Sequence, residues 1–387
     1  MRTAVVGLAV AAVTVTGIGG IAQAEQSGER KDRGHAATQR AIDAVVAAGV
    51  PGALGQARDK DGVWKGSSGV GNVKTITPRG ANDRFRIGSV TKTFTAAVLL
   101  QMEADGLLDL DDTVEKWLPG LVRGNGNDGR KITVRMLLNH TSGLFNYLED
   151  NTFYQKYLVA PGFFQHRYDT HTPEQLVRVG IAHKPYFAPG TQHNYSNTGY
   201  ILAGMIIEKA GGSSYEQEMT RRIIKPLGLR GTSAPGKATG MPQPSGRGYD
   251  PLSLAPNATK LYDTTELSPT IAWSSGDLIS TTGDLNRFFS ALMRGKLFPR
   301  EQLNAMKTTV PDPDEPGQGY GLGIRTIATK CGAKVWGHPG GIPGGTSYGL
   351  TTEDGRHTFA FNMNAEISKA LGIVEEIPSA EFCRSAT

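Results

Sequence analysis

A serine and a lysine stand three positions apart where a polar stretch of the chain becomes an apolar run. They belong to GSVTKTFTAAVLL, residues 88–100, which predicts a helix from about residue 90 to residue 104. Residues three apart lie on one face of a helix, so Ser89 and Lys92 point the same way. Serine is a poor nucleophile at neutral pH, and an adjacent amine that takes its proton activates it for acyl transfer. The structural alternative is that Ser89 caps the helix beside a solvated Lys92.

Two later stretches carry further polar groups beside regular elements. In HNYSNTGYILAGMIIEKAGG, Tyr195 and Asn197 lie at the start of a predicted helix that Gly211 ends. Residues two apart in extended backbone face one side, so a phenol and a carboxamide could enter one cleft. His338 ends a predicted strand, and the glycines after it let a substrate backbone approach closely. Taken singly, each residue also has a structural explanation: Asn197 as a cap, Tyr195 as a packed aromatic, and His338 as a buried histidine.

The three stretches together carry a family resemblance. In chain order, SVTK, YSN and HPG resemble the motifs of the penicillin-recognising serine hydrolases. The second and third forms look like the branch that holds class C β-lactamases and secreted actinobacterial D-alanyl-D-alanine carboxypeptidases. The likeness extends to DRFRIGSVTKTFTAAVLLQMEADGLLDLDD, NHTSGL, QGYGLGIR and the pair of cysteines, and so covers nearly the whole chain.

The resemblance implies a role for each catalytic group. Ser89 would be the nucleophile and Lys92 its hydrogen-bonded partner. Tyr195 would be the general base for acylation and the acid toward the leaving amine, while Asn197 would contact the substrate amide. A lysine ammonium close to a tyrosine favours the phenolate, so we expect a lowered pKa for Tyr195.

The resemblance also implies how substrate is held. His338 and Gly340 would line the cleft from the strand side, and the backbone N–H groups of Ser89 and Gly341 would form the oxyanion hole. Arg325 would receive a terminal carboxylate with its planar fork of donors. One further residue, Trp273 in IAWSSG, would form a wall of the cleft.

One departure from the family concerns the third motif. The carboxypeptidases resemble H-T-G-T there, whereas this chain reads His338-Pro339-Gly340-Gly341 and lacks both hydroxyls. Each lost hydrogen bond to a charged group could cost roughly 1.5–3 kcal/mol. The motifs therefore support acyl-serine chemistry more strongly than recognition of a free carboxylate.

These residues predict an exported serine hydrolase that forms an acyl-enzyme without a metal or organic cofactor. The favoured activity is that of a D-alanyl-D-alanine carboxypeptidase on peptidoglycan stem peptides. A β-lactamase, an esterase, a D-aminopeptidase and a non-catalytic cell-wall-binding protein remain open alternatives. We expect a peptide or β-lactam substrate, the cell wall as surroundings, and a monomer.

The hydrophobic pattern predicts an α+β fold resembling that of β-lactamases and penicillin-binding proteins. An antiparallel sheet flanked by helices would be assembled from residues 25–106 and 266–387, with a mostly helical lobe over 107–265. Turn signals at Asp61-Gly62 and Asp354-Gly355 predict two hairpins of that sheet.

Composition and charge indicate a globular protein and argue against a nucleic-acid-binding one. Of the 387 residues, 39% are hydrophobic and 20% are charged, as in ordinary globular proteins. The net charge is only +5, and lysine and arginine form no stripe, which argues against nucleic-acid binding.

The N-terminus and the two cysteines indicate an extracellular protein. Residues 1–24 end in Ala22-Gln23-Ala24 and predict a signal peptide, with a membrane anchor as the alternative. No later apolar run is long enough to cross a bilayer. We expect Cys331 and Cys383 to form a disulfide in that compartment, two unpaired thiols being the alternative. Neither cysteine has neighbours at the spacing of a zinc site.

Overall fold

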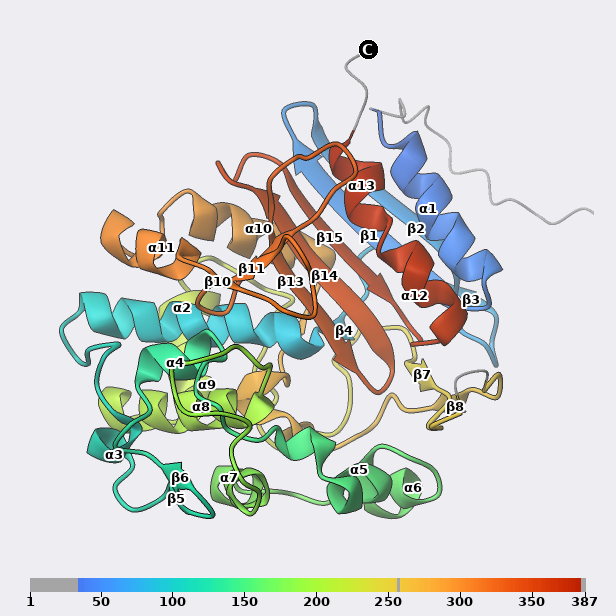
Figure 1. The fold of residues 1–387 in the computed structure, drawn as a ribbon. Coiled ribbons are helices and arrows are strands. Elements are labelled where there is room, and N and C mark those ends of the chain that lie inside the picture. Colours follow the sequence, from blue (N-terminus) through green and yellow to red (C-terminus); the bar gives the residue numbers. More distant parts are fainter. Residues whose placement is uncertain (1–33, 256–257, 384–387) are drawn as a thin grey trace, which may run out of the picture. The chain divides into compact units, whose positions relative to one another are not determined.

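A nine-stranded antiparallel sheet joins strands from the two ends of the chain (Figure 1). The computed structural model describes residues 34–255 and 258–383. The strand order is β10-β11-β12-β13-β14-β15-β1-β2-β3, so the N-terminal hairpin continues the C-terminal strands. The strands are β1 Gly52–Asp59, β2 Gly62–Asn72, β3 Thr77–Pro78, β10 Val310–Pro311, β11 Gly319–Tyr320, β12 Arg325–Ile327, β13 Val335–Ile342, β14 Gly345–Thr352 and β15 Thr358–Met363.

Both predicted hairpins are present. β1 and β2 pair with Asp59 opposite Gly62. β14 and β15 pair with Thr351 opposite Thr358, and Gly355 in their turn has a positive φ of 67°. That left-handed conformation is one that glycine adopts without strain.

Helices cover both faces of the sheet (Figure 1). On one face, α1 (Ala36–Ala47), α12 (Ser368–Val374) and α13 (Ile377–Phe382) enclose a core that contains Phe359 and Phe361. The residue between these two phenylalanines, Ala360, belongs to the core formed with α10 (Thr282–Met293). Because successive strand residues point to opposite faces, α10 covers the other face.

The two helices that carry the chemistry are buried in that second core. The 3₁₀ turn η1 (Gly88–Val90) leads into α2 (Thr91–Ala104), and α8 (Asn197–Gly211) packs against α2. The bounds of α2 and α8 agree with the helices predicted from the sequence, including the end of α8 at Gly211. The left-handed Gly212 follows it with a φ of 71°.

The remaining elements are short. The helices are α3 Val114–Trp117, α4 Val134–Leu138, α5 Asn151–Tyr157, α6 Gly162–His166, α7 Pro173–Ile181, α9 Tyr215–Met219 and α11 Arg300–Lys307. Single helical turns are η2 Tyr147–Glu149, η3 Thr220–Ile224, η4 Pro269–Ile271 and η5 Trp273–Ser275. Three small strand pairs complete the fold: β4 Phe85–Arg86 with β9 Ile279–Ser280, β5 Arg123–Gly124 with β6 Asn127–Asp128, and β7 Tyr249–Asp250 with β8 Tyr262–Asp263.

The architecture confirms the predicted α+β class, with strands from both chain ends and helices between them. The lobe boundaries at residues 106 and 266 stay a prediction. The predicted signal peptide, residues 1–24, lies outside the described residues. Within the described part of the chain, none of the helices combines the length and apolar character needed to span a bilayer.

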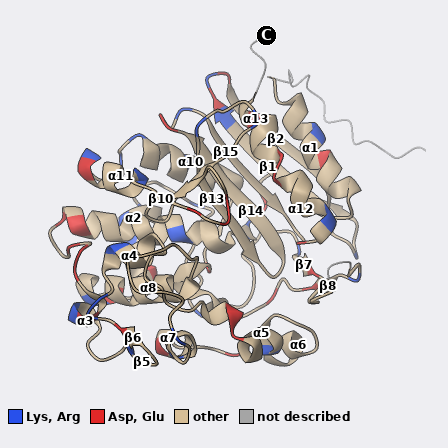
Figure 2. Cartoon of the chain, viewed as in Figure 1, with Lys and Arg blue, Asp and Glu red and all other residues tan. Residues whose placement is uncertain are grey.

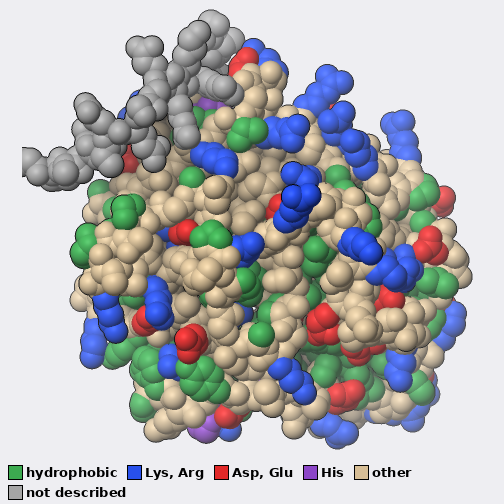
Figure 3. Space-filling model, turned by 180° about the vertical axis from the view of Figure 1, so that it is seen from behind, with side chains coloured by type: hydrophobic (Ala, Val, Ile, Leu, Met, Phe, Trp, Pro, Cys, Tyr) green, Lys and Arg blue, Asp and Glu red, His purple; other side chains and the backbone are tan. Residues whose placement is uncertain are grey.

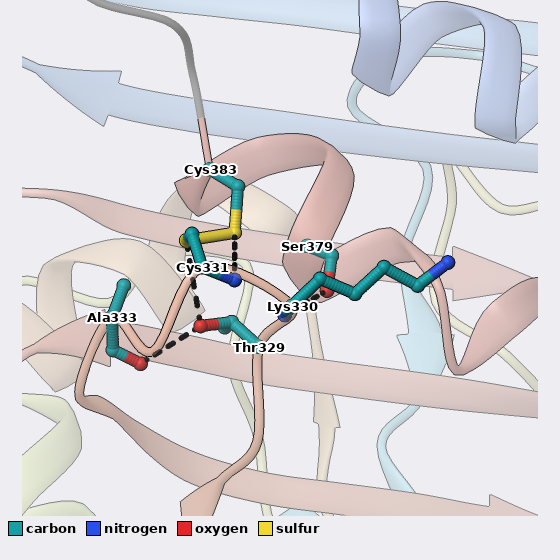
Figure 4. Close-up of a disulfide and its surroundings, with 6 residues drawn as sticks. All are labelled: Thr329, Lys330, Cys331, Ala333, Ser379 and Cys383. Atoms are coloured by element: carbon teal, nitrogen blue, oxygen red, sulfur yellow. Dashed lines mark hydrogen bonds between the residues drawn. A yellow bond between two sulfur atoms is a disulfide. The ribbon is translucent and has the colours of Figure 1, made fainter.

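Cys331 and Cys383 form the predicted disulfide, with an S–S distance of 2.05 Å (Figure 4). It ties the loop after β12 to the end of α13. In the same loop, the backbone N–H of Lys330 donates to Ser379 Oγ of α13 at 3.0 Å (Figure 4). Closing a loop of this length contributes on the order of 4 kcal/mol in the chain-entropy model.

Charged residues of both signs are interspersed along the described elements (Figure 2). On the face seen from behind, lysines and arginines are scattered among neutral and acidic side chains (Figure 3). This distribution agrees with the sequence argument against an extended basic stripe.

Candidate active site

Ser89 is presented by the turn that precedes α2. Gly88 has a positive φ of 52°, and a Cβ there would lie 2.7 Å from the carbonyl oxygen of Gly341 in β13. Glycine therefore allows the turn to lie directly against the strand. As a result Ser89 is partly exposed, while Lys92, one turn into the helix, is completely buried.

Lys92 Nζ has three hydrogen-bond partners. It lies 3.0 Å from Ser89 Oγ, 2.7 Å from Asn197 Oδ1 and 2.8 Å from the carbonyl oxygen of Ser275. Burial places the pKa of Lys92 well below its ordinary value, which favours the neutral amine. In the neutral amine, the two oxygens that can only accept would receive the two N–H groups, which would leave the lone pair for the hydroxyl of Ser89. Lys92 is therefore placed to take the proton of Ser89.

Tyr195 lies next to Lys92, close to Ser89. Lys92 Nζ is 4.8 Å from the centre of its ring, and Ser89 is near enough to act on the pKa of Tyr195. Burial raises the pKa of Tyr195, and Ser89 and the charge of Arg325 offset this only in part. The expected lowering of the Tyr195 pKa is therefore wrong, because burial of the phenol outweighs the effects of Ser89 and Arg325. A neutral phenol suits Tyr195 to donate a proton.

Asn197 orients the lysine. Its Oδ1 accepts from Lys92, and its Nδ2 donates to Asn146 Oδ1 at 3.1 Å. The same Asn146 oxygen accepts from the backbone N–H of Asn197 at 3.2 Å, which fixes the first turn of α8. Asn197 also lines the cleft beside Ser89, where the sequence placed it. Asn146 was missed, because nothing in its local sequence marks it as a partner of α8.

β13 brings the two glycines of the third motif to the nucleophile. A Cβ on Gly340 would lie 2.1 Å from the carbonyl oxygen of Ile87 and 3.0 Å from the backbone nitrogen of Ser89. Gly341 follows it and lines the cleft with Ser89. The strand and the turn thus lie close enough for the backbone N–H groups of Ser89 and Gly341 to serve one oxyanion.

His338 lies behind the cleft, with only 1% of its surface exposed. Its Nδ1 is 2.5 Å from the carbonyl oxygen of Pro339, and its Nε2 is 2.7 Å from Tyr320 Oη. Burial is the main cause that lowers its pKa to about 3. His338 is thus a neutral imidazole that donates from Nδ1 and accepts from Tyr320. It is not among the side chains that line the cleft, and it supports β13 from within.

Arg325 is held by acidic side chains of its own chain. Its Nη2 lies 3.1 Å from Asp312 Oδ2 and 3.6 Å from Glu315 Oε1, and its side chain is 12% exposed. Its charge acts on Tyr195 and His338, so it lies near the site without lining the cleft.

Trp273 also stands apart from the cleft lining. Its indole Nε1 donates to Glu216 Oε1 at 3.2 Å, and its ring packs against Tyr215. The residues around it, Ala272 and Ser275, line the cleft instead.

The cleft in front of Ser89 has a volume of about 570 Å³. Its walls include the apolar side chains of Leu148, Leu158 and Ile342 and two carboxylates, Asp250 and Glu366. Sequence reasoning missed both acids, since neither lies in a motif or at a spacing that marks a site. Among the described residues, no group of three or more histidines, cysteines or acids is placed to hold a metal ion.

A serine in contact with a buried lysine, with a phenol and two backbone N–H groups close by, is an arrangement suited to a serine hydrolase. Residues 38–375 match the family model described as Beta-lactamase, and the chain belongs to that family.

Solved structures of amide hydrolases share the fold. A D-stereospecific amidohydrolase from a Streptomyces species is 52% identical, with a TM-score of 0.85 over 91% of this chain and 99% of that one. The D-amino acid amidase of Ochrobactrum anthropi SV3, complexed with L-phenylalanine amide, is 27% identical, with a TM-score of 0.76 over 89% of this chain and 97% of that one.

Relatives named as a penicillin-binding protein and as a carboxypeptidase are less similar in sequence than the Streptomyces amidohydrolase is. Penicillin-binding protein 4* of Bacillus subtilis is 27% identical over 79% of this chain and 66% of its own length. A D-alanyl-D-alanine-carboxypeptidase/endopeptidase, AmpH, of Escherichia coli is 27% identical over 62% of this chain and 59% of its own. The chain spans about half to two thirds of the length of the curated relatives it matches first.

Proposed function

We propose that this serine hydrolase cleaves amides whose acyl part carries a free amino group, such as D-amino acid amides and short peptides that begin with a D-residue. The observation that carries the proposal is the pair of carboxylates, Asp250 and Glu366, that line the same cleft as Ser89. A substrate ammonium group would find opposite charge there. The D-configuration is taken from the solved relatives, which are described as a D-stereospecific amidohydrolase and a D-amino acid amidase.

The two acids lie on the substrate side of the oxyanion hole. Glu366 Oε2 accepts from Thr346 Oγ1 at 3.1 Å, and a Cβ on Gly341 would approach the same oxygen to 3.1 Å. Glu366 is therefore beside the strand that binds the acyl carbonyl. Burial raises the pKa of Asp250 to about 6, and the charge of Glu366 adds to this. An ammonium group between them would relieve that repulsion and keep Asp250 ionised.

The proposed reaction needs only groups of this chain and water. Lys92 takes the proton of Ser89 as its Oγ attacks the amide carbon, and the N–H groups of Ser89 and Gly341 hold the oxyanion. Tyr195 gives its proton to the leaving nitrogen, the C–N bond breaks, and Lys92 returns its proton to the phenolate. Water then attacks the acyl carbon of the Ser89 ester and gives a proton to Lys92. The bond between the acyl carbon and Ser89 Oγ breaks, Lys92 returns the proton to Oγ, and the acid product leaves.

A D-alanyl-D-alanine carboxypeptidase is the second candidate, favoured by the position of Arg325 close to Tyr195. That activity needs Arg325 to bind a terminal carboxylate, and Asp312 already engages it at 3.1 Å. The amine-binding cleft has no such competitor within the described residues that line it. We also propose that the protein is exported and works near the cell wall, on the signal-peptide pattern of residues 1–24.

Substrate pairs test the proposal directly. We expect D-phenylalanine amide to be cleaved at least about 100-fold more efficiently than its N-acetyl form, because acetylation removes the ammonium charge. Glu366→Gln and Asp250→Asn should each lower kcat/KM for the free amine by about tenfold and leave the acetylated substrate unchanged. Glu301→Gln on the exposed side of α11 is the matched control, and Ser89→Ala should abolish all turnover.

Two results would reject this function. One is equal or better cleavage of the acetylated amide. The other is efficient release of D-alanine from a diacylated D-Ala-D-Ala peptide, together with an Arg325→Ala variant that loses activity only on peptides with a free terminal carboxylate. That result would establish the carboxypeptidase activity instead.

A further inference from the structure

A second cavity borders the turn between β13 and β14. It shares only Ile342 and Pro343 with the catalytic cleft. Four arginines line it: Arg79, Arg84, Arg86 and Arg247. None of the described residues that line it is acidic. Three carboxylates, those of Asp83, Asp263 and Asp277, act on three of these four guanidinium groups, so the net charge around the cavity is positive by one.

Two of these arginines are buried and incompletely bonded. Arg79 and Arg86 are only 4% and 7% exposed. Arg79 Nη2 donates to Asn362 Oδ1, and Arg86 Nη2 donates to the carbonyl oxygens of Thr239 and Leu267. Within the described part of the chain, Arg79 Nε and both Nε and Nη1 of Arg86 have no hydrogen-bond partner.

The carboxylates nearest to these arginines do not supply the missing bonds. Asp83 Oδ2 is 3.7 Å from Arg79 Nε, beyond hydrogen-bond distance. The charge of Asp277 acts on Arg86, yet among the described residues neither of its carboxylate oxygens has a hydrogen-bond partner. Burial lowers the pKa of both arginines to about 10, so the protein destabilises their charged forms. A buried, under-bonded guanidinium is costly unless an anion or water completes it.

The other two arginines stand at the rim. Arg84 is partly exposed and donates to the carbonyl oxygen of Gln243, while the exposed Arg247 lies 3.2 Å from Asp263 Oδ2. Gly246 also lines the cavity, next to Arg247 in the chain. A Cβ on Gly246 would lie 2.2 Å from Arg79 Nη1. A side chain at this position would push against the guanidinium.

We propose that this cavity is a binding site for a small inorganic anion, of the size of phosphate or chloride. The cavity has a volume of about 30 Å³, compared with about 570 Å³ for the catalytic cleft. It is therefore too small to hold a peptide. Guanidinium groups bind oxyanions through paired, charge-assisted hydrogen bonds, which the unbonded nitrogens of Arg79 and Arg86 can supply. The bound anion would lie beside the β13–β14 turn.

Thermal unfolding of the whole protein in low-salt buffer tests this proposal, with sodium phosphate and sodium chloride titrated at matched ionic strength. We expect a saturable rise in Tm with at least one anion, and the anion that saturates first identifies whether the site prefers an oxyanion or a halide. The double variant Arg84→Gln/Arg247→Gln keeps the buried arginines and should weaken binding by about tenfold or more. Arg287→Gln, an exposed arginine on α10, should bind like the unmodified protein.

A bromide-soaked crystal gives the position independently of stability. An anomalous peak between Arg79 and Arg86 would support the site. The proposal is overturned if neither anion gives saturable stabilisation, or if the rim variant and the Arg287→Gln control respond identically. These readouts do not involve catalysis, so they stand whatever substrate the enzyme cleaves.

Discussion

Lys92 Nζ of α2 and Asn197 Oδ1 of α8 lie 2.7 Å apart, although 105 positions separate them in the chain. This contact joins the two helices at the point where the nucleophile is activated. The carboxamide gives the buried lysine an acceptor in place of water, and Asn146 holds the carboxamide in turn. The orientation of the base toward Ser89 therefore depends on the packing of α8 against α2.

Replacing Asn197 should slow the chemical step. We expect Asn197→Ala to lower kcat by roughly 100-fold, since a base misplaced by about 1 Å loses that much. Burst kinetics of acylation by a D-amino acid amide or a fluorescent penicillin would measure it. Asn304→Ala, at an exposed position of α11, is the control. A variant that changes KM alone would show that Asn197 binds substrate without orienting Lys92.

The lowered pKa of Lys92 predicts how stability and activity depend on pH. Between that pKa and the ordinary value of 10.5, the unfolded chain binds one more proton at this position than the folded protein does. The free energy of unfolding should therefore rise with pH across this window, and Lys92→Met should remove that part of the slope. The exposed Lys296→Met should leave it intact. Urea unfolding at a series of pH values measures the slope.

The activity of the unmodified enzyme reports the same ionisation. kcat/KM should rise with pH through the pKa of Lys92, because only the neutral amine accepts the proton of Ser89. If kcat/KM instead fell with rising pH through the same window, Lys92 would have to act as an ammonium group.

Local signals explain what the sequence predicted well. The helix of Ser89 and Lys92 and the helix that begins at Asn197 both have long apolar patterns that end at glycine, and the structure reproduces both. The disulfide was predicted from two cysteines and the expectation that the protein is exported. In each case the determining residues lie within one element, or no other partner exists in the sequence.

Long-range packing explains what the sequence missed. The pKa of Tyr195 depends on desolvation by residues from several elements, so the sign of its shift could not be obtained from Lys92 alone. The engagement of Arg325 by Asp312 depends on how the segments around β10, β11 and β12 pack. Asp250 and Glu366 line the same cleft only because β7 and the segment after β15 both border it.

Two adjacent glycines of β13 should respond very differently to an added methyl group. Gly340→Ala would place Cβ 2.1 Å from the carbonyl oxygen of Ile87, a backbone atom that cannot yield without moving the turn before Ser89. Gly341→Ala meets only Glu366 Oε2, at 3.1 Å, and retains its N–H. We expect Gly340→Ala to lower the acylation rate by at least about 100-fold and Gly341→Ala by less than about tenfold. Equal losses would contradict the proposed contact between β13 and the nucleophile turn.

Tyr320 should matter for stability through His338. Since His338 Nδ1 donates to the carbonyl oxygen of Pro339, its Nε2 depends on the Tyr320 hydroxyl as donor. Tyr320→Phe leaves that buried acceptor without a donor and should destabilise the protein by about 1–3 kcal/mol. Tyr168→Phe removes an exposed hydrogen bond to Glu266 and should cost less than about 1 kcal/mol.

The same histidine should make the protein sensitive to acid. Its pKa is about 3 in the folded protein and 6.5 in its ordinary state, so the unfolded chain binds the extra proton between these values. The stability contributed by neutral His338 should therefore fall as the pH drops from about 6.5 toward 3, by up to about 1.4 kcal/mol per pH unit. Nitrogen chemical shifts of the His338 ring, followed by NMR from pH 8 to about 4, should stay those of the Nδ1–H tautomer. Titration of this ring near pH 6.5 would show that Tyr320 and Pro339 do not hold it neutral.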